Sequence, residues 1–275
     1  MSEASARPRA RVPRSTGGWT VRETRDREEI LAVLNQDRVY AAYAIGDLEP
    51  SLFAQCEWAL AEHADGTRAL ALLFKGLEPH TLLLYGDPRG HAVILAGVMR
   101  PPKVYAIFTE EQEPALRARY ALAEVQRMVR MVWDRTAPLP PPSPLTFRLT
   151  GARLAELQSL YRLYAEARFS PYQLMDGIFY GVERDGRLVA VAGTHLVSET
   201  YGVAAIGNVF THPDYRGRGY ALACTAAVLR DLAARIPTIV LNVGVENETA
   251  QRVYTKLGFA RYCEFYEAMA YRKRA

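Results

Sequence analysis

Residues 203–235 pass from an apolar, strand-like run through a loop with two glycines into a helix-like run. The loop reads RGRGYA over residues 216–221. Glycine has no Cβ and reaches positive φ at little cost, so this loop can turn sharply and expose consecutive backbone N–H groups. The helix that follows adds unpaired N–H donors and a partial positive charge at its N-terminus. The sequence therefore predicts an α/β fold with an anion-binding site at this loop. Phosphate groups are the usual ligands of such sites.

Two familiar phosphate-binding loops do not fit this stretch. The dinucleotide fingerprint needs a third glycine where Leu222 stands, and its loop follows the strand directly, whereas THPDY intervenes here. The nucleoside-triphosphate loop needs Gly-Lys-Ser/Thr, which RGRGYA lacks. A Gly-x-Gly on its own is also compatible with a plain turn before a helix, so the interpretation depends on the residues further on.

The second half of the chain shows a regular order of helical and strand patterns. Apolar residues recur at helical spacing in three segments, and Asp185-Gly186 is a turn signal between two strand-like runs. The expected elements are a helix at 154–169, strands at 178–184, 187–196 and 203–210, a helix at 221–235, a strand at 238–245, a helix at 247–257 and a strand at 262–271.

A proline-rich segment, TAPLPPPSPLT at 136–146, divides the chain. Such a segment has few backbone donors and stays extended, so it is typical of a stiff spacer. We therefore expect a disordered tail at 1–18, an α/β domain at 19–135, a linker at 136–146 and a second domain at 147–275.

Charge and cysteine content indicate the class of protein. The formal net charge is +4, and the arginines are spread along the sequence, which is typical of a solvated surface and not of a nucleic-acid footprint. Cys56, Cys224 and Cys263 show no metal-binding spacing and favour a reducing compartment. The N-terminus lacks the apolar core of a secretory signal, and apolar runs such as 92–99 are too short to span a bilayer. We expect a cytoplasmic protein with no metal, nucleic-acid or membrane partner. A homodimer is compatible with the sequence.

The glycine loop and a later segment together resemble the two donor-site motifs of the GNAT superfamily of N-acyltransferases. Arg216-x-x-Gly219-x-Ala221 matches its Arg/Gln-x-x-Gly-x-Gly/Ala signature, and NETAQRVYTKLGF at 247–259 matches its second element. Both occur in the family's order, each with a strand before its helix, within residues 146–272. The resemblance implies a mostly antiparallel mixed sheet splayed at an acyl-CoA site, with acetyl-CoA or another acyl-CoA as co-substrate and no metal.

The resemblance also implies roles for particular residues. The loop N–H groups would hold the pyrophosphate, the end of the preceding strand would pair with pantetheine, and one strand N–H would polarise the thioester carbonyl. Asn247 would bind pantetheine and is equally compatible with an ordinary helix N-cap. Tyr254 would donate a proton to the departing CoA thiolate, and its alternative is a core aromatic. The implied cofactor-binding residues are Val209, Phe210, Thr211, Arg216, Gly217, Arg218, Gly219, Tyr220, Ala221, Asn247 and Tyr254.

The implied reaction is acyl transfer, most simply of acetyl, to a primary amine of a small molecule or peptide by direct attack in a ternary complex. The amine arrives mostly as ammonium near neutral pH, so a group must take its proton. The two positions at which members of the family carry a glutamate base are Ala205 and Asn242 here. His195, Glu199 and Glu264 are the substitutes within reach, and a water relay is the alternative. The missing glutamates also leave open a non-catalytic acyl-CoA-binding sensor.

The first half reads as mixed α/β and has the size of a second, degenerate copy of the same fold. No counterpart of either donor-site motif occurs before residue 136, so we expect no CoA site there. Its expected role is structural, or to form a wall of the acceptor site. The expected elements are strands at 20–24, 68–74, 80–85 and 104–108, helices at 27–34 and 113–120, and either type at 124–134.

Overall fold

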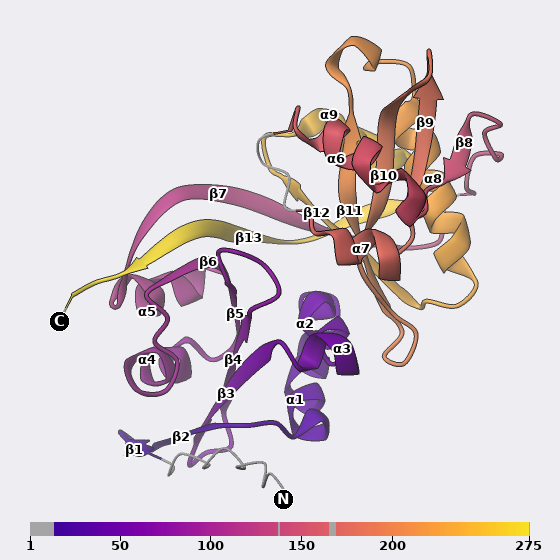
Figure 1. Cartoon of the computed structure of the whole chain (residues 1–275). Helices are drawn as coiled ribbons and strands as arrows, with labels where there is room; N and C mark the ends of the chain where they lie inside the picture. Colours follow the sequence, from indigo (N-terminus) through magenta and orange to yellow (C-terminus); the bar gives the residue numbers. More distant parts are fainter. Residues whose placement is uncertain (1–13, 137, 165–168, 275) are drawn as a thin grey trace, which may run out of the picture. The chain divides into compact units, whose positions relative to one another are not determined.

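The computed structural model describes residues 14–136, 138–164 and 169–274 (Figure 1). The chain divides into two compact units. The first unit comprises the N-terminal residues through Gln36, Gln55–Val125 and the C-terminal residues from Glu267, and the second comprises Asp37–Ala54 and Gln126–Tyr266. Each unit is built from a sheet with helices, so the predicted mixed α/β class is confirmed. The proline-rich segment 136–146 lies within the span of the second unit, and most of the expected tail falls outside the described residues.

The sheet of the first unit has the order β1-β2-β3-β4-β5-β6. Its strands pair antiparallel except β5 and β6, which run parallel. Asp26 caps α1 by accepting from the N–H groups of Glu28 and Glu29, and apolar residues of that helix are buried. The elements are β1 (Arg14–Thr16), β2 (Trp19–Glu23), α1 (Arg27–Leu34), β3 (Cys56–His63), β4 (Arg68–Phe74), β5 (Thr81–Gly86), α4 (Pro88–Gly97), β6 (Lys103–Phe108) and α5 (Glu113–Arg117).

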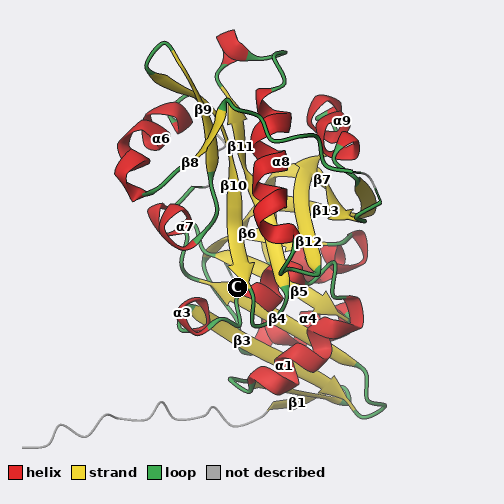
Figure 2. Ribbon diagram, turned by 90° about the vertical axis from the view of Figure 1, so that its right-hand side faces the viewer, coloured by secondary structure: helices red, strands yellow, loops and turns green. Residues whose placement is uncertain are grey.

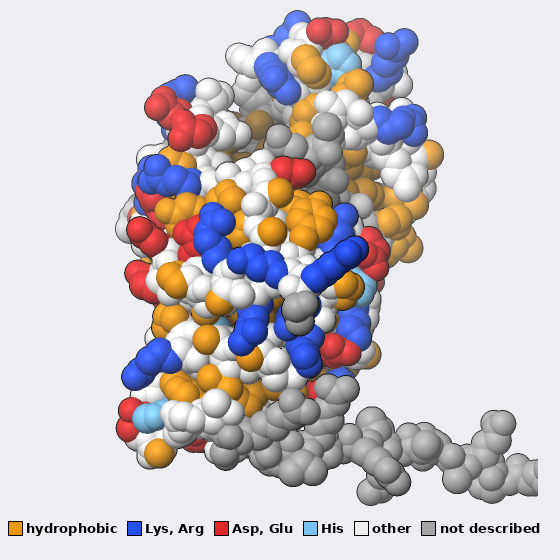
Figure 3. Space-filling model, turned by 90° about the vertical axis from the view of Figure 1, so that its left-hand side faces the viewer, with side chains coloured by type: hydrophobic (Ala, Val, Ile, Leu, Met, Phe, Trp, Pro, Cys, Tyr) orange, Lys and Arg blue, Asp and Glu red, His pale blue; other side chains and the backbone are white. Residues whose placement is uncertain are grey.

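Basic side chains from separate segments come together on the first unit. Lys273 Nζ donates to the Arg117 carbonyl at 2.7 Å, and its N–H donates to the Arg119 carbonyl at 2.9 Å. Lys103 Nζ lies 5.5 Å from the centre of the Tyr271 ring. Figure 3 shows Lys and Arg side chains gathered in a band on one face of the molecule. Basic side chains that are dispersed along the sequence are thus partly collected on one face.

The strands of the second unit follow the order β13-β7-β12-β11-β10-β9-β8. Strand β7 belongs to this unit from Gln126 onward, and β13 belongs to it up to Tyr266. Strands β11 and β12 run parallel, while β7/β12, β10/β11, β9/β10 and β8/β9 are antiparallel. Helix α8 packs its apolar residues against this sheet, as Figure 2 shows. The elements are β7 (Tyr120–Trp133), β8 (Thr146–Arg148), α6 (Leu154–Tyr161), α7 (Pro171–Asp176), β9 (Tyr180–Arg184), β10 (Arg187–Ser198), β11 (Val203–Thr211), α8 (Tyr220–Ala233), β12 (Thr238–Gly244), α9 (Glu248–Lys256) and β13 (Phe259–Arg272).

Residues 37–54 come from the first half of the sequence but belong to the second unit. They form the short helices α2 (Ala42–Gly46) and α3 (Pro50–Phe53). A Cβ on Gly46 would lie 2.4 Å from Leu196 Cδ1, and the Ser198 hydroxyl donates to Glu49 Oε1 at 2.6 Å. Leu196 pairs with Ala205 on β11, whereas the next residue, Ile206, joins the core that contains α8. Because neighbouring strand residues point to opposite faces, residues 37–54 cover the face of the sheet opposite α8.

One sequence-based expectation differs from the observed elements, and one ambiguous run is resolved. The helix expected at 154–169 ends at Tyr161, and residues 165–168 lie outside the described part. Tyr164 and Phe169 still pack against the core that contains the apolar residues of α6. The apolar spacing therefore identified residues that pack on this core, but it did not indicate how far the helix extends. The ambiguous run at 124–134 is strand, as part of β7. In the described part of the chain no helix is long and apolar enough to cross a membrane.

Candidate functional site

The parallel strands β11 and β12 separate halfway along their length. Their pairs run from Val203↔Thr238 to Ile206↔Leu241 and then stop, although β11 continues to Thr211 and β12 to Gly244. Asn208 has φ +54°, and the pairing of β11 with β10 shifts register beside it, which marks a bulge that bends β11. Past Ile206 the β12-side edge of β11 therefore has backbone groups that an extended ligand can pair with.

The glycine loop lies at the open end of β11. Gly217 and Gly219 have φ of +75° and +77°. A Cβ at either position would meet no atom within 4 Å, so the backbone conformation requires glycine and leaves open space in front of it. Gly219 is the N-cap of α8 and has no side chain that could accept a hydrogen bond. The first N–H group of the helix that has a backbone acceptor is that of Ala223, which donates to the Gly219 carbonyl at 3.0 Å. The N–H groups in the first turn of α8 are thus available to an anion.

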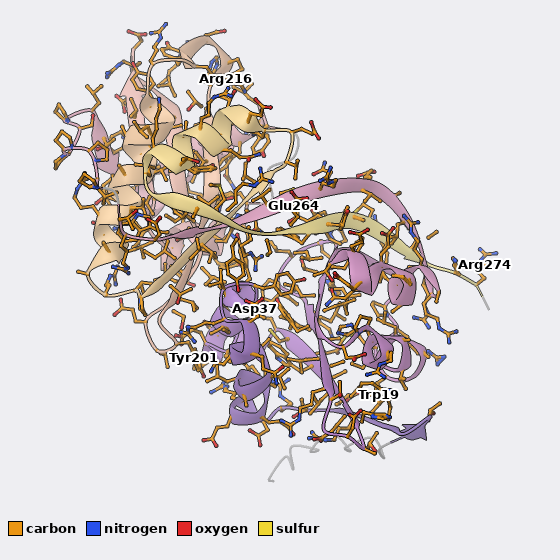
Figure 4. The ribbon with its side chains drawn as sticks, turned by 180° about the vertical axis from the view of Figure 1, so that it is seen from behind. Trp19, Asp37, Tyr201, Arg216, Glu264 and Arg274 are labelled. Atoms are coloured by element: carbon orange, nitrogen blue, oxygen red, sulfur yellow. The ribbon has the colours of Figure 1, made fainter. Side chains whose placement is uncertain are left out.

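Two arginines flank this loop. Arg216, labelled in Figure 4, donates from Nε to the Thr211 carbonyl at 3.2 Å, and its guanidinium lies 5.8 Å from the centre of the Phe210 ring. Arg218 donates to the Asp214 carbonyl at 3.3 Å. Within the ranges that the structure describes, neither forms an ion pair with a carboxylate, so both charges remain free to attract an anion.

Asn247 and Tyr254 sit on α9 as the sequence predicted. Asn247 Oδ1 accepts from the Ala250 N–H at 3.1 Å, so the side-chain oxygen caps the helix and the amide NH2 group remains as a donor. Tyr254 is buried and packs edge-on to Phe259, with ring centres 6.2 Å apart. Burial, and secondarily the nearby Tyr164, raises the pKa of Tyr254 well above its ordinary value, so the phenol stays protonated at neutral pH.

Tyr164 lies near Tyr254 of α9 and also contacts β11. Its ring stacks on Phe210, with centres 5.2 Å apart and planes 5° from parallel. Tyr161 of α6 donates its hydroxyl to the Asn208 carbonyl at 2.5 Å. Thr211 Oγ1 is buried and has no hydrogen-bond partner among the residues that the structure describes. A buried hydroxyl of this kind at the end of β11 is compatible with a ligand partner, and the role of Thr211 in binding pantetheine stays a prediction.

The three candidate bases, none of which the sequence singled out, lie in different surroundings. His195 lies on β10 with its ring against the backbone of Gly207, because a Cβ on that glycine would be 2.0 Å from His195 Nε2. Gly207 is the first residue of β11 beyond the last pair with β12, so His195 stands where the strands part. Glu199 is exposed and paired with Arg235.

Glu264 lies on β13 and is labelled in Figure 4. It accepts from Arg127 and Arg261, each at 2.8 Å. These guanidinium groups, Arg127 first, lower the pKa of Glu264, which weakens it as a base at neutral pH.

Asn242 and Ala205, the two positions at which the resemblance would place a glutamate base, contact other parts of the protein here. Ala205 is fully buried. Asn242 Oδ1 accepts from Arg130 Nε at 2.9 Å, and Arg130, 1% exposed, also donates to the Tyr40 carbonyl. The guanidinium lies 4.8 Å from the centre of the Tyr43 ring. Asn242 therefore helps to hold a buried cation that anchors residues 37–54.

The sequence analysis did not identify three further residues of the second unit, two of which lie beside His195. Tyr43 lies with its ring centre 5.8 Å from that of His195, and Gln173 of α7 lies 3.3 Å from His195 Nδ1. Asp47 follows Tyr43 by one helical turn and donates its N–H to the Tyr43 carbonyl at 3.0 Å. Burial raises the pKa of Asp47 to about 8. The Ser170-Pro171-x-Gln173 pattern was a readable helix-start signal, whereas nothing in the spacing of Tyr43 and Asp47 connects them to the glycine loop.

Replacing Asp47 with asparagine should change the pH dependence of stability. The unfolded chain releases this proton near pH 4 and the folded chain near pH 8, so the folded state binds more protons between these values and wild-type stability falls as pH rises. Asp47→Asn removes the titration and keeps the shape. We expect its melting temperature to exceed that of the wild type increasingly from about pH 5 to about pH 8. A difference that is constant across this range would contradict the raised pKa.

Replacing Gly207 with alanine should displace His195. Gly207 does not have a positive φ, so the backbone accepts alanine, but the new methyl group would overlap the imidazole. We expect a loss of about 1–3 kcal/mol in the free energy of unfolding, measured with urea, as for other overpacked sites. Gly97→Ala in α4 is the matched control, since its Cβ would meet nothing within 4 Å and should leave stability unchanged or raised. Equal effects of the two substitutions would contradict the His195 placement.

Comparison with known proteins agrees with this geometry. Residues 150–259 match the model of the acetyltransferase (GNAT) family. The mycothiol acetyltransferase of Nocardiopsis dassonvillei is 33% identical over 113 residues, which are 38% of this chain and 33% of that protein. The chain thus matches about a third of the length of this curated relative.

Solved structures share the fold. A GNAT-family protein from Novosphingobium aromaticivorans is 24% identical with a TM-score of 0.58, covering 74% of this chain and 89% of its own. A GCN5-related N-acetyltransferase from Sphaerobacter thermophilus is 18% identical with a TM-score of 0.57, covering 94% of this chain and 97% of its own. In the described ranges no group of three or more His, Cys, Asp or Glu residues could hold a metal ion.

Proposed function

We propose that this protein transfers an acetyl group from acetyl-CoA to a primary amine, because residues 150–259 match the model of the acetyltransferase (GNAT) family. The observation that carries the proposal is the combination of a parted strand pair with an uncapped helix N-terminus. The open edge of β11 suits an extended chain such as pantetheine, and the first turn of α8 suits a pyrophosphate.

Acetyl-CoA supplies the activated acyl group, and the residues of this chain bind and orient it. Gly217 to Ala221 offer backbone N–H donors to the pyrophosphate, with Arg216 and Arg218 adding charge. Val209, Phe210 and Thr211 lie on the free edge of β11, where a backbone N–H can donate to the thioester carbonyl. The Asn247 amide NH2, which the N-cap contact leaves as a donor, is proposed to bind pantetheine.

Tyr254 is proposed to protonate the departing thiolate. Its phenol is held protonated by burial, so the proton is in place when the thiolate forms. A phenol with so high a pKa is a weak acid toward a thiolate in water, for which the thiol pKa is about 8.5. The same desolvation raises the pKa of the CoA thiol as well, since burial disfavours any anion. The free-energy cost of moving the proton from Tyr254 to the thiolate is therefore smaller inside the site than in water.

The acceptor is proposed to be a primary amine of a small molecule or peptide. The first experiment measures release of CoA thiol from acetyl-CoA over a panel of amines. Small-molecule amines are included because the curated relative is a mycothiol acetyltransferase, and short peptides with free N-termini complete the panel. Thiol release that depends on the amine supports the proposal, and its absence across the panel with intact acetyl-CoA binding opposes it.

A non-catalytic acyl-CoA sensor is the second candidate, and the engagement of Asn242 with Arg130 favours it. At this position the chain has an amide that holds a buried cation in place of a carboxylate base. Tight binding of acetyl-CoA without thiol release to any amine would select this candidate. A cytoplasmic location remains part of the proposal and rests on the sparse, free cysteines.

A further inference from the structure

We propose that Tyr161 is a positioning residue for acetyl transfer, whose hydroxyl fixes the direction of the bulged peptide group between Asn208 and Val209. The Val209 N–H then faces the opening between β11 and β12, where it donates to the thioester carbonyl. This inference rests on the proposed function for its catalytic consequence. The direction of the peptide group follows from contacts within the second unit and can be measured without any activity.

The pairing of β11 with β10 shows which way Val209 points. The His212 N–H donates to the Val189 carbonyl at 2.8 Å, and the same register pairs Phe210 with Val191. Hydrogen-bonded pairs alternate along an antiparallel ladder, so the N–H and C=O groups of Phe210 point to β10. The groups of Val209, the preceding residue of the strand, therefore point away from β10. That side is the edge of β11 along which the pairs with β12 have already stopped.

The bulge leaves the Asn208 carbonyl without a ladder partner on β10. Asn208 and Val209 are the two residues of β11 that oppose only Ala192 of β10. Ala192 follows a residue whose groups point to β11, so its own N–H points to β9, with which it also pairs. The Asn208 carbonyl belongs to the same trans peptide group as the Val209 N–H and points the opposite way, to the β10 side. The extra residue of a bulge is left unpaired in this manner.

The Tyr161 hydroxyl takes the place of the missing donor. It donates to the Asn208 carbonyl at 2.5 Å, and its ring, 6% exposed, lies against Phe169 with centres 5.1 Å apart. Burial raises the pKa of Tyr161, so the hydroxyl keeps its proton and remains a donor. Asn208 has φ +54°, which residues other than glycine seldom adopt, so local preference alone does not favour this bulge. The hydroxyl contact holds the carbonyl on the β10 side and thereby the Val209 N–H on the open side.

Replacing Tyr161 with phenylalanine removes the hydroxyl and keeps the ring. We expect kcat to fall about 100-fold, because a Val209 N–H that has turned away no longer donates to the oxygen on which charge develops. The affinity for CoA, which has no thioester carbonyl, should stay within about twofold of the wild-type value. Steady-state kinetics with the best amine of the panel and calorimetry with CoA give both quantities. An unchanged kcat, or an affinity for CoA that falls as much as kcat, would overturn the proposal.

Nuclear magnetic resonance follows the peptide group in the free protein. The dipeptide Asn-Val occurs at 208–209 and at 242–243, so asparagine labelled with carbonyl carbon-13 and valine labelled with nitrogen-15 give two signals. Val209→Ile removes one of them and so assigns it. Loss of the hydroxyl contact in Tyr161→Phe should move the Asn208 carbonyl signal upfield, while the 242–243 signal of β12 stays in place. A 208–209 signal that does not move would overturn the proposal.

Two ligands test the Val209 N–H itself. Acetyl-CoA and CoA share every group except the acetyl thioester. We expect the Val209 amide proton of the wild type to move further downfield with acetyl-CoA than with CoA, because a hydrogen bond to the thioester carbonyl deshields it. The difference should disappear in Tyr161→Phe. Equal shifts with the two ligands in the wild type would overturn the donor role.

Tyr120→Phe is the matched control. The Tyr120 hydroxyl is buried in the first unit and also donates to a backbone carbonyl, that of Pro101, at 3.0 Å. The substitution should lower the melting temperature about as much as Tyr161→Phe and leave kcat and the 208–209 signal unchanged. If the wild type binds acetyl-CoA but releases no CoA with any amine, the proposed function fails, while the signals of the free and bound protein still decide the direction of the peptide group.

Discussion

Replacing Gly219 with aspartate is expected to abolish measurable binding of acetyl-CoA, with a loss of at least about 100-fold in affinity, or about 2.7 kcal/mol. Gly219 has φ +77° and open space where a Cβ would point, directly before the first turn of α8. The new carboxylate would occupy the space assigned to the pyrophosphate and would repel it. Calorimetric titration of both proteins with acetyl-CoA measures the change.

A matched control separates this effect from backbone strain. Gly66 lies between β3 and β4 in the first unit with φ +86° and nothing within 4 Å of a Cβ. Gly66→Asp therefore has the same charge change and a similar cost for a side chain at positive φ. It should bind acetyl-CoA like the wild type. Equal losses in both variants would indicate destabilisation, and a wild type that does not bind would mean that RGRGYA is only a turn.

Replacing Tyr254 with phenylalanine is expected to lower kcat about 100-fold while the affinity for acetyl-CoA stays within about twofold. The substitution removes the hydroxyl and keeps the ring that packs on Phe259. The thiolate must then leave without a positioned proton, which affects the transition state and not the binding of the donor. Steady-state kinetics with the best amine of the panel, together with calorimetry, gives both quantities.

Tyr120→Phe is the control for loss of a buried tyrosine hydroxyl. Tyr120 is fully buried in the first unit and donates to the Pro101 carbonyl at 3.0 Å. Its substitution should cost about 1 kcal/mol of stability without a change in kcat. If Tyr254→Phe behaves in the same way, Tyr254 is a core aromatic and the thiolate takes its proton from water.

The elements around the glycine loop were readable because their signals are local. The sequence predicted a strand at 203–210 and a helix at 221–235, and the structure has β11 at Val203–Thr211 and α8 at Tyr220–Ala233. The need for glycine at position 219 was also readable, since a turn into a helix at positive φ is a property of a few consecutive residues. Short helices such as α2 and α3 were missed, because four or five residues are too few to show a period.

By itself the sequence determined the order of strands and helices in the second half, the glycine loop and the spacing of Asn247 and Tyr254, because each depends on neighbours along the chain. Only the tertiary structure decided where β11 leaves β12 and that residues 37–54 cover the second unit. It also decided that Gln173 faces His195. These features depend on contacts between residues far apart in the sequence, and such contacts leave no periodic pattern in the segments that make them.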